Sequence, residues 1–115
     1  MVVKIKNLRL RTVIGINEEE QNKIQEILIN IQIQIDGEKA SQSDAIEDTV
    51  NYKKLRNEII DHVEGRKFQL IEKIAADIAK IVMSHPLPQS VSVEVDKPHA
   101  LRLSESVSAT VELFR

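Results

Sequence analysis

A lysine held against a proline ends a strand-like pattern in the run VDKPHALRLSESVS, residues 95–108. Valine alternates with polar residues from 91 to 96, which predicts a half-buried strand. Pro98 cannot donate to a sheet ladder and restricts the residue before it, so we expect the strand to stop there. Lys97 is then either a charge that protects a sheet edge or a fixed acid–base group, and its position alone leaves both interpretations open.

Two further side chains, Tyr52 and Glu72, are candidates for catalysis or ligand binding, and each also has an ordinary structural interpretation. Tyr52 opens an expected helix, where the helix dipole would ease loss of its proton, but a half-buried tyrosine that bonds water or backbone is more common. Glu72 lies near the start of a second expected helix. It is either a solvated carboxylate or an anchor that accepts two parallel N–H bonds from a planar, amidine-like heterocycle. Position favours the ordinary interpretation for Tyr52 and decides nothing for Glu72.

The remaining polar candidates are less specific. Glu20 ends an acidic run that usually faces solvent, although one carboxylate of such a run can orient a catalytic water or lysine. The three histidines, His62, His85 and His99, lack metal-binding spacing, so we expect no metal site. His99 stands out because it directly follows the lysine–proline pair.

A small basic patch for a phosphate is a further possibility. Arg9, Arg11 and Arg102 would supply it, although scattered surface arginines are ordinary. The formal net charge of -2, with one tyrosine and two phenylalanines in 115 residues, argues against nucleic-acid binding. The absence of cysteine excludes disulfides and cysteine-ligated metal and fits a reducing compartment. With no signal-peptide or membrane-spanning pattern, we expect a cytoplasmic protein without membrane association.

Hydrophobic periodicity predicts the elements that position these residues. Residues 3–11 alternate with a phase slip near Asn7, which predicts one bulged strand that ends at Gly15. Isoleucine at every second position from 27 to 35 predicts a strand with one core face and one polar, uncharged face. The other expected segments are loops at 17–21, 39–48 and 97–105, helices at 51–65 (N-cap Asn51) and about 68–84, and strands at 91–96 and 107–113.

The order β-β-α-α-β-β indicates one α+β domain over residues 1–115, with two helices on one face of an antiparallel sheet. The two edges of a four-stranded sheet would be exposed. Joining such sheets edge to edge in a closed ring would cover them, so we expect a homo-oligomer.

Five short patterns occur in order along the chain. They are Ile14-Gly15-Ile16 followed by Glu20-Gln21; Val50-Asn51-Tyr52; His62-Val63-Glu64-Gly65 followed by Phe68; Leu70-Ile71-Glu72-Lys73; and Lys97-Pro98-His99-Ala100-Leu101. Together they resemble the dihydroneopterin aldolase family, which includes dihydroneopterin triphosphate 2'-epimerases, over nearly the whole chain. The resemblance implies the tunnelling fold (T-fold), in which four subunits close a barrel and two rings stack into an octamer.

Subtype cues within the family look more like the epimerases. Aldolases typically carry an aromatic pair before the loop glutamate, where this chain reads Asn17-Glu18-Glu19-Glu20. The runs Leu8–Thr12 and His99–Arg102, the latter followed by Ser106-Val107-Ser108, also resemble the epimerases.

The resemblance assigns roles in substrate binding. Glu72 matches the glutamate that anchors the amino-pyrimidinone edge of a pterin, with backbone contacts from Leu70 and Ile71. His99 lies beside the catalytic motif and is a further substrate-binding candidate. Charge alone suggests that His99 and the three arginines named above hold a triphosphate.

The resemblance also assigns catalysis. Lys97 matches the catalytic lysine, Tyr52 the tyrosine at the reaction centre and Glu20 the loop glutamate, with Tyr52 supplied by a neighbouring subunit. The implied reaction is a retro-aldol and aldol sequence without metal, Schiff base or cofactor, which epimerises C2' of 7,8-dihydroneopterin triphosphate. The alternatives are the aldolase, which releases 6-hydroxymethyl-7,8-dihydropterin and glycolaldehyde, and a non-catalytic pterin- or purine-binding module or scaffold.

Overall fold

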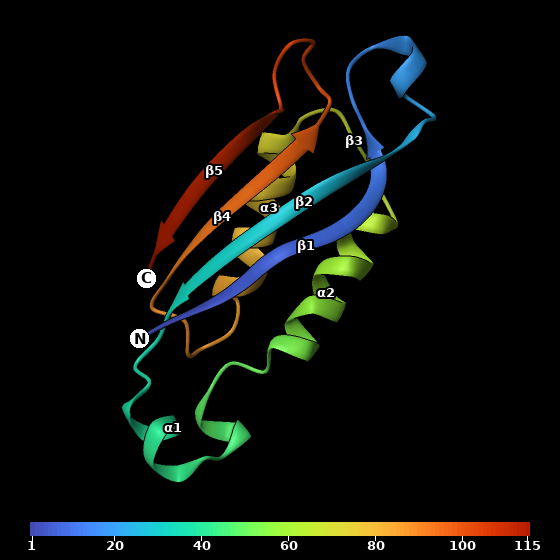
Figure 1. Ribbon diagram of the computed structural model, residues 1–115. Helices are drawn as coiled ribbons and strands as arrows, with labels where there is room; N and C mark the ends of the chain where they lie inside the picture. The colour runs from blue at the N-terminus through green and yellow to red at the C-terminus, as the bar shows by residue number, and fades with distance from the viewer.

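Five strands form one curved sheet in the order β3-β1-β2-β4-β5, and the computed structural model describes residues 1–115 (Figure 1). Neighbouring strands are antiparallel except β3, which runs parallel to the end of β1. The strands are β1 (Val2–Ile14), β2 (Ile24–Gln34), β3 (Lys67–Phe68), β4 (Ser90–Pro98) and β5 (Ser106–Phe114). The predicted α+β order is confirmed. The expectation of four strands was wrong, because the sheet also contains the short β3, which pairs with Val13 and Ile14.

The bulge in β1 lies where the phase slip predicts it. The pairing of β1 with β2 shifts between Ile5 and Leu8, and Asn7 has a φ of 51°. Asparagine tolerates this left-handed backbone better than most residues. The backbone N–H of Asn7 donates to the Asn30 side chain on β2 at 2.9 Å, which fixes the bulge.

Two long helices cover one face of the sheet, α2 (Tyr52–Glu64) and α3 (Ile71–Met83) (Figure 1). The predicted N-cap is confirmed, because the Asn51 side chain accepts a hydrogen bond from the Lys54 backbone N–H at 3.2 Å. The helix expected from Phe68 begins three residues later. Phe68 belongs instead to β3, where its carbonyl accepts a hydrogen bond from Gly15 at 3.1 Å.

The segments expected as loops contain short helical turns. Residues 17–21 include the 3-10 turn η1 (Glu18–Glu20), and residues 39–48 include most of α1 (Glu38–Ser43) and the 3-10 turn η2 (Ile46–Asp48). None of these turns has a buried residue, so no hydrophobic periodicity marked them in the sequence.

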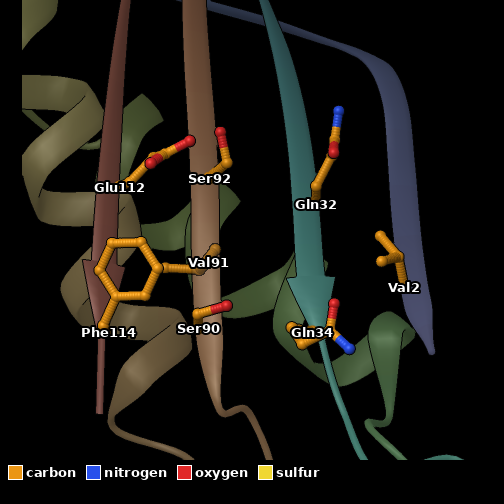
Figure 2. Close-up of a pocket in the computed structure, with 8 residues that line it drawn as sticks. All are labelled: Val2, Gln32, Gln34, Ser90, Val91, Ser92, Glu112 and Phe114. Carbon is orange, nitrogen blue, oxygen red and sulfur yellow. The ribbon is translucent and has the colours of Figure 1, made fainter.

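The core lies between the helices and the inward face of the sheet. The isoleucines at odd positions from 27 to 35 are all buried there, together with valines of β4 and the apolar stripes of α2 and α3. The other face of the sheet is polar, as predicted. Figure 2 shows Gln32, Ser92 and Glu112 there, on three neighbouring strands, beside a shallow cavity of about 250 Å³.

The end of β4 extends past the predicted stop. Lys97 and Pro98 still pair with β5, opposite Val107 and Ser106, whereas pairing with β2 ends at Asp96. Because only one strand accompanies Pro98, its missing N–H interrupts no central ladder. Strand side chains alternate, so Lys97 lies on the same face as the buried valines of β4 and points to the helix side.

Candidate active site

A cavity of about 310 Å³ opens at the end of the sheet where β1 and β4 finish and α3 begins. The turn after β1, the end of β4 and the first turn of α3 contribute its walls. Five of the predicted site residues line this one cavity: Glu20, Leu70, Ile71, Glu72 and Lys97. The fold therefore brings together segments that are more than seventy residues apart in sequence.

An ion pair joins two of these residues. The Lys97 Nζ lies 2.7 Å from the Glu20 Oε2, and the two side chains are only 15% and 16% exposed. A pair with this little exposure is less screened by water and salt than a surface pair. Glu20 is thus not a solvated member of an acidic turn, and Lys97 is not a free charge at a sheet edge.

Two amide side chains complete the surroundings of the Glu20 carboxylate. Gln25 Nε2 donates to Glu20 Oε2 at 2.9 Å, and Asn17 Nδ2 donates to Oε1 at 3.0 Å. Hydrogen bonds from Lys97 first, and then from Gln25, lower the pKa of Glu20 from 4.5 to about 2, against the opposing effect of burial. Glu20 is therefore an anion at every physiological pH.

The two amides were not identified from the sequence. Gln25 resembles an ordinary strand residue, yet it continues the odd-numbered isoleucine stripe by one step toward the N-terminus, on the face that turns to the core. A polar residue at such a position was the available signal, because a core-facing amide needs hydrogen-bond partners. No local signal marked Asn17.

Gly15 makes room for this carboxylate. Its φ of 145° is a conformation that favours glycine, and a β-carbon there would overlap the Glu20 side chain. The Gly15 N–H donates to the Phe68 carbonyl, so the backbone cannot easily move away. The glycine lets the Glu20 carboxylate pack directly against the end of β1.

Glu72 supplies a second carboxylate to the lining of the cavity. It lies in the first turn of α3, which Leu70 precedes as N-cap, and it has no hydrogen-bond or ion-pair partner in the protein. The helix dipole favours a negative charge at this place. A free carboxylate there is able to accept two parallel N–H bonds from a planar ligand.

Tyr52 is not part of this cavity. It begins α2 and is 57% exposed, whereas the last turn of α2 contacts Thr12 near the end of β1. With 1.5 Å of rise per residue, the two ends of the helix are about 18 Å apart. Figure 1 shows the start of α2 toward the end of the molecule opposite β3. Tyr52 and Lys97 of the same chain therefore do not meet.

The predicted phosphate contacts are dispersed. Arg9 forms an exposed ion pair with Glu26 at 3.2 Å, and Arg11 lies on the same side of β1, away from the helices. His99 and Arg102 lie on the exposed connection between β4 and β5. None of the four lines the cavity, and their role toward a triphosphate stays a prediction.

No group of three or more His, Cys, Asp or Glu side chains is arranged to hold a metal ion. No helix has the length and apolar character that crossing a bilayer requires.

Comparison with known proteins decides the family. The profile of FolB, dihydroneopterin aldolase, matches residues 3–113. The chain belongs to the dihydroneopterin aldolase family. It is 46% identical to the dihydroneopterin triphosphate 2'-epimerase of Escherichia coli (strain K12), over 99% of this chain and 95% of that protein. It is 29% identical to the dihydroneopterin aldolase of the same strain, over 96% of this chain and 91% of that protein.

The fold agrees with this assignment. The crystal structure of E. coli dihydroneopterin aldolase in complex with neopterin superposes with a TM-score of 0.93 at 28% identity, and the match covers 98% of each chain. The dihydroneopterin aldolase family and the tunnelling fold inferred from the five sequence patterns are both confirmed. The higher identity to the epimerase also agrees with the subtype cues.

Proposed function

We propose that this chain is an isomerase that epimerises C2' of 7,8-dihydroneopterin triphosphate to give dihydromonapterin triphosphate. The observation that carries the proposal is one cavity lined by a shielded Lys97–Glu20 ion pair and by the unpaired Glu72 carboxylate. The epimerase is preferred to the aldolase because the chain is 46% identical to an epimerase and 29% identical to an aldolase. A cysteine-free chain also suits a cytoplasmic enzyme.

The substrate is held by its pterin ring. Glu72 accepts two parallel N–H bonds from the amino-pyrimidinone edge, and the backbone at Leu70 and Ile71 completes the contact. This places the three-carbon side chain of the pterin toward the Lys97 end of the cavity. The neopterin bound by the related E. coli aldolase supports a pterin as the ligand.

The reaction breaks and remakes one carbon–carbon bond. Lys97, acting through water, helps to remove the proton of the 2'-hydroxyl, and the C1'–C2' bond breaks as the electron pair moves into the C=N of the dihydropterin. The Tyr52 hydroxyl takes part in proton transfer at the resulting enol. The aldehyde turns while it stays bound. The electron pair returns from the ring to C1', which adds to the other face of the aldehyde, and the new 2'-oxygen takes back a proton, so C2' is inverted. A closed site that holds the fragments together favours this outcome over aldehyde release.

The active site is shared between subunits in this proposal. Tyr52 of one subunit reaches the Lys97 and Glu72 of its neighbour, in an octamer made of two tetrameric rings. Two features support the sharing: Tyr52 is exposed far from its own cavity, and β5 and most of β1 are open sheet edges.

The test is to incubate the purified protein with 7,8-dihydroneopterin triphosphate and, separately, with dihydroneopterin, and to resolve the C2' epimers and cleavage products by chromatography. Epimer formation from the triphosphate with little cleavage is the expected result. Rapid release of 6-hydroxymethyl-7,8-dihydropterin would instead establish the aldolase. Tight pterin binding without turnover would assign the chain to the non-catalytic class.

A further inference from the structure

The core face of β2 changes from apolar to polar at the end nearest the cavity. The odd-numbered residues from 27 to 35 are isoleucines, but Gln25 takes the next position on that face. Its register partner on β1, Thr12, is the one buried polar residue of the chain. Polar side chains on a core face carry a cost unless they are hydrogen-bonded, so this pair requires an explanation.

Both donor positions of the Gln25 amide are in use. Nε2 donates to the Ile14 carbonyl at 2.8 Å and to Glu20 Oε2 at 2.9 Å. The first bond ties the amide to the backbone at the end of β1. The second bond holds Glu20, which lies in the short turn η1 outside the sheet, at a defined place relative to that backbone.

The oxygen that accepts from Gln25 is the oxygen that binds Lys97. Glu20 Oε2 lies 2.7 Å from Lys97 Nζ, while Oε1 is bound by Asn17 of the same turn. Asn17 therefore fixes Glu20 only relative to its own loop. Apart from Lys97 itself, Gln25 alone connects the Glu20 carboxylate to the sheet by a hydrogen bond.

We infer that Gln25 is a positioning residue, which holds the Glu20 oxygen that sets where the Lys97 nitrogen lies over the cavity. The kinetic consequence of this inference rests on the proposed function. The contact chain from Ile14 through Gln25 and Glu20 to Lys97 does not, and it is testable without a substrate.

The charges around Glu20 fix the expected pH dependence. Lys97 from β4 faces the carboxylate, Glu72 from α3 lines the same cavity, and Glu18 and Glu19 belong to the same turn. The pKa of Glu20 is lowered to about 2, with Gln25 as the second cause after Lys97. Removing the Gln25 donor raises this pKa, so the anion, and the position of Lys97 with it, is lost at a higher pH when the solution is acidified.

The kinetic test compares Gln25→Met, which keeps the chain length and removes the donor, with Gln34→Met on the outer face of the same strand. We expect Gln25→Met to lower kcat roughly tenfold with KM changed less than about twofold, because a misplaced group costs rate more than binding. The acidic limb of its kcat/KM profile should move to higher pH. The Gln34 variant should match the parent in all three measurements.

A second variant gives an opposite pH response. Gln25→Glu places a carboxylate against the Glu20 anion at neutral pH, so it should be less active than Gln25→Met there. As the pH falls, the introduced carboxyl group takes up a proton and becomes a donor again. Its activity relative to Gln25→Met should therefore rise on acidification, which a purely structural role of Gln25 would not produce.

The substrate-independent test is a ¹³C NMR titration of the Glu20 carboxyl in the parent and in Gln25→Met. We expect a higher titration midpoint in the variant. An unchanged midpoint together with an unchanged kcat would overturn the inference. If the parent turns over neither pterin, the proposed function fails by itself, and the titration still decides whether Gln25 holds Glu20.

Discussion

The predicted catalytic residues lie at the two ends of the molecule, and their surroundings differ between these ends. At the Lys97 end, the ion pair to Glu20 is shielded, the carboxylate is bound by two amides, and a cavity is in place beside Glu72. At the other end, Tyr52 is largely exposed, and its hydroxyl makes no hydrogen bond in the protein. A cavity of about 290 Å³ lies next to it, lined partly by Lys54 and His85.

This difference indicates which of the predicted site residues a single chain brings together. Lys97 and Glu72 lie on β4 and α3, which pack on one core. Glu20, in the turn after β1, is held by hydrogen bonds from Lys97, Gln25 and Asn17. Tyr52 is the first residue of a helix that Asn51 caps, and it does not line the cavity that holds Lys97 in the same chain. The first end is complete within the chain, and the second is presented outward.

The largest effect should come from removing the lysine. Lys97→Ala leaves the Glu20 anion without its charged partner and removes the acid–base group of the proposed mechanism. We expect kcat to fall by about 10²–10⁴-fold, the usual contribution of an acid–base group, with the oligomer intact by size-exclusion chromatography. Epimerisation of dihydroneopterin triphosphate measures the effect. A rate close to that of the parent would remove Lys97 from the mechanism.

The second prediction tests whether the two ends cooperate between subunits. Lys97→Ala and Tyr52→Ala should each be nearly inactive alone, but co-expression of the two should restore activity. In a random assembly, about one shared site in four receives both native residues, so about a quarter of the parent rate is expected. If the co-expressed chains stay as inactive as the separate variants, Tyr52 does not act on a neighbour's Lys97.

Most of the fold was predictable because burial alternates along the strands. The alternating isoleucines of β2 and valines of β4 indicate which face of each strand packs on the core. The change of phase in the hydrophobic pattern near Asn7 indicates the bulge. Strand β3 has only two residues, which are too few to show a period in the sequence. It forms because it pairs with the distant end of β1. For the same reason, the sequence placed the start of α3 three residues too early.

The site was predictable in its charged members and not in its supporting ones. Lys97, Glu20 and Glu72 stood in patterns that resemble a family. The Lys97–Glu20 contact, however, spans 77 positions, and no local pattern records it. Gln25 is recognisable only when its strand register is known, because the same amide one residue away would face the other side of the sheet.

The smallest of the three effects concerns Gly15 and acts on the Lys97 end alone. In Gly15→Ala the new methyl group overlaps the Glu20 carboxylate, and the φ of 145° is unfavourable for alanine. The carboxylate must shift, and Lys97 with it. We expect roughly a tenfold loss of kcat. Gly65→Ala is the matched control, because Gly65 has an ordinary φ of -87° and its nearest contact would be a backbone oxygen at 3.2 Å.

Co-expression separates this local lesion from general instability. A Gly15→Ala chain still presents a normal Tyr52, and a Tyr52→Ala chain still has a normal Lys97 end. Mixing these two should recover activity. Mixing Gly15→Ala with Lys97→Ala should not, because both lesions then lie in the same half of every site and no site receives an intact Lys97 end. If neither mixture recovers activity, Gly15 affects the whole fold, and its lesion is not confined to the Lys97 end.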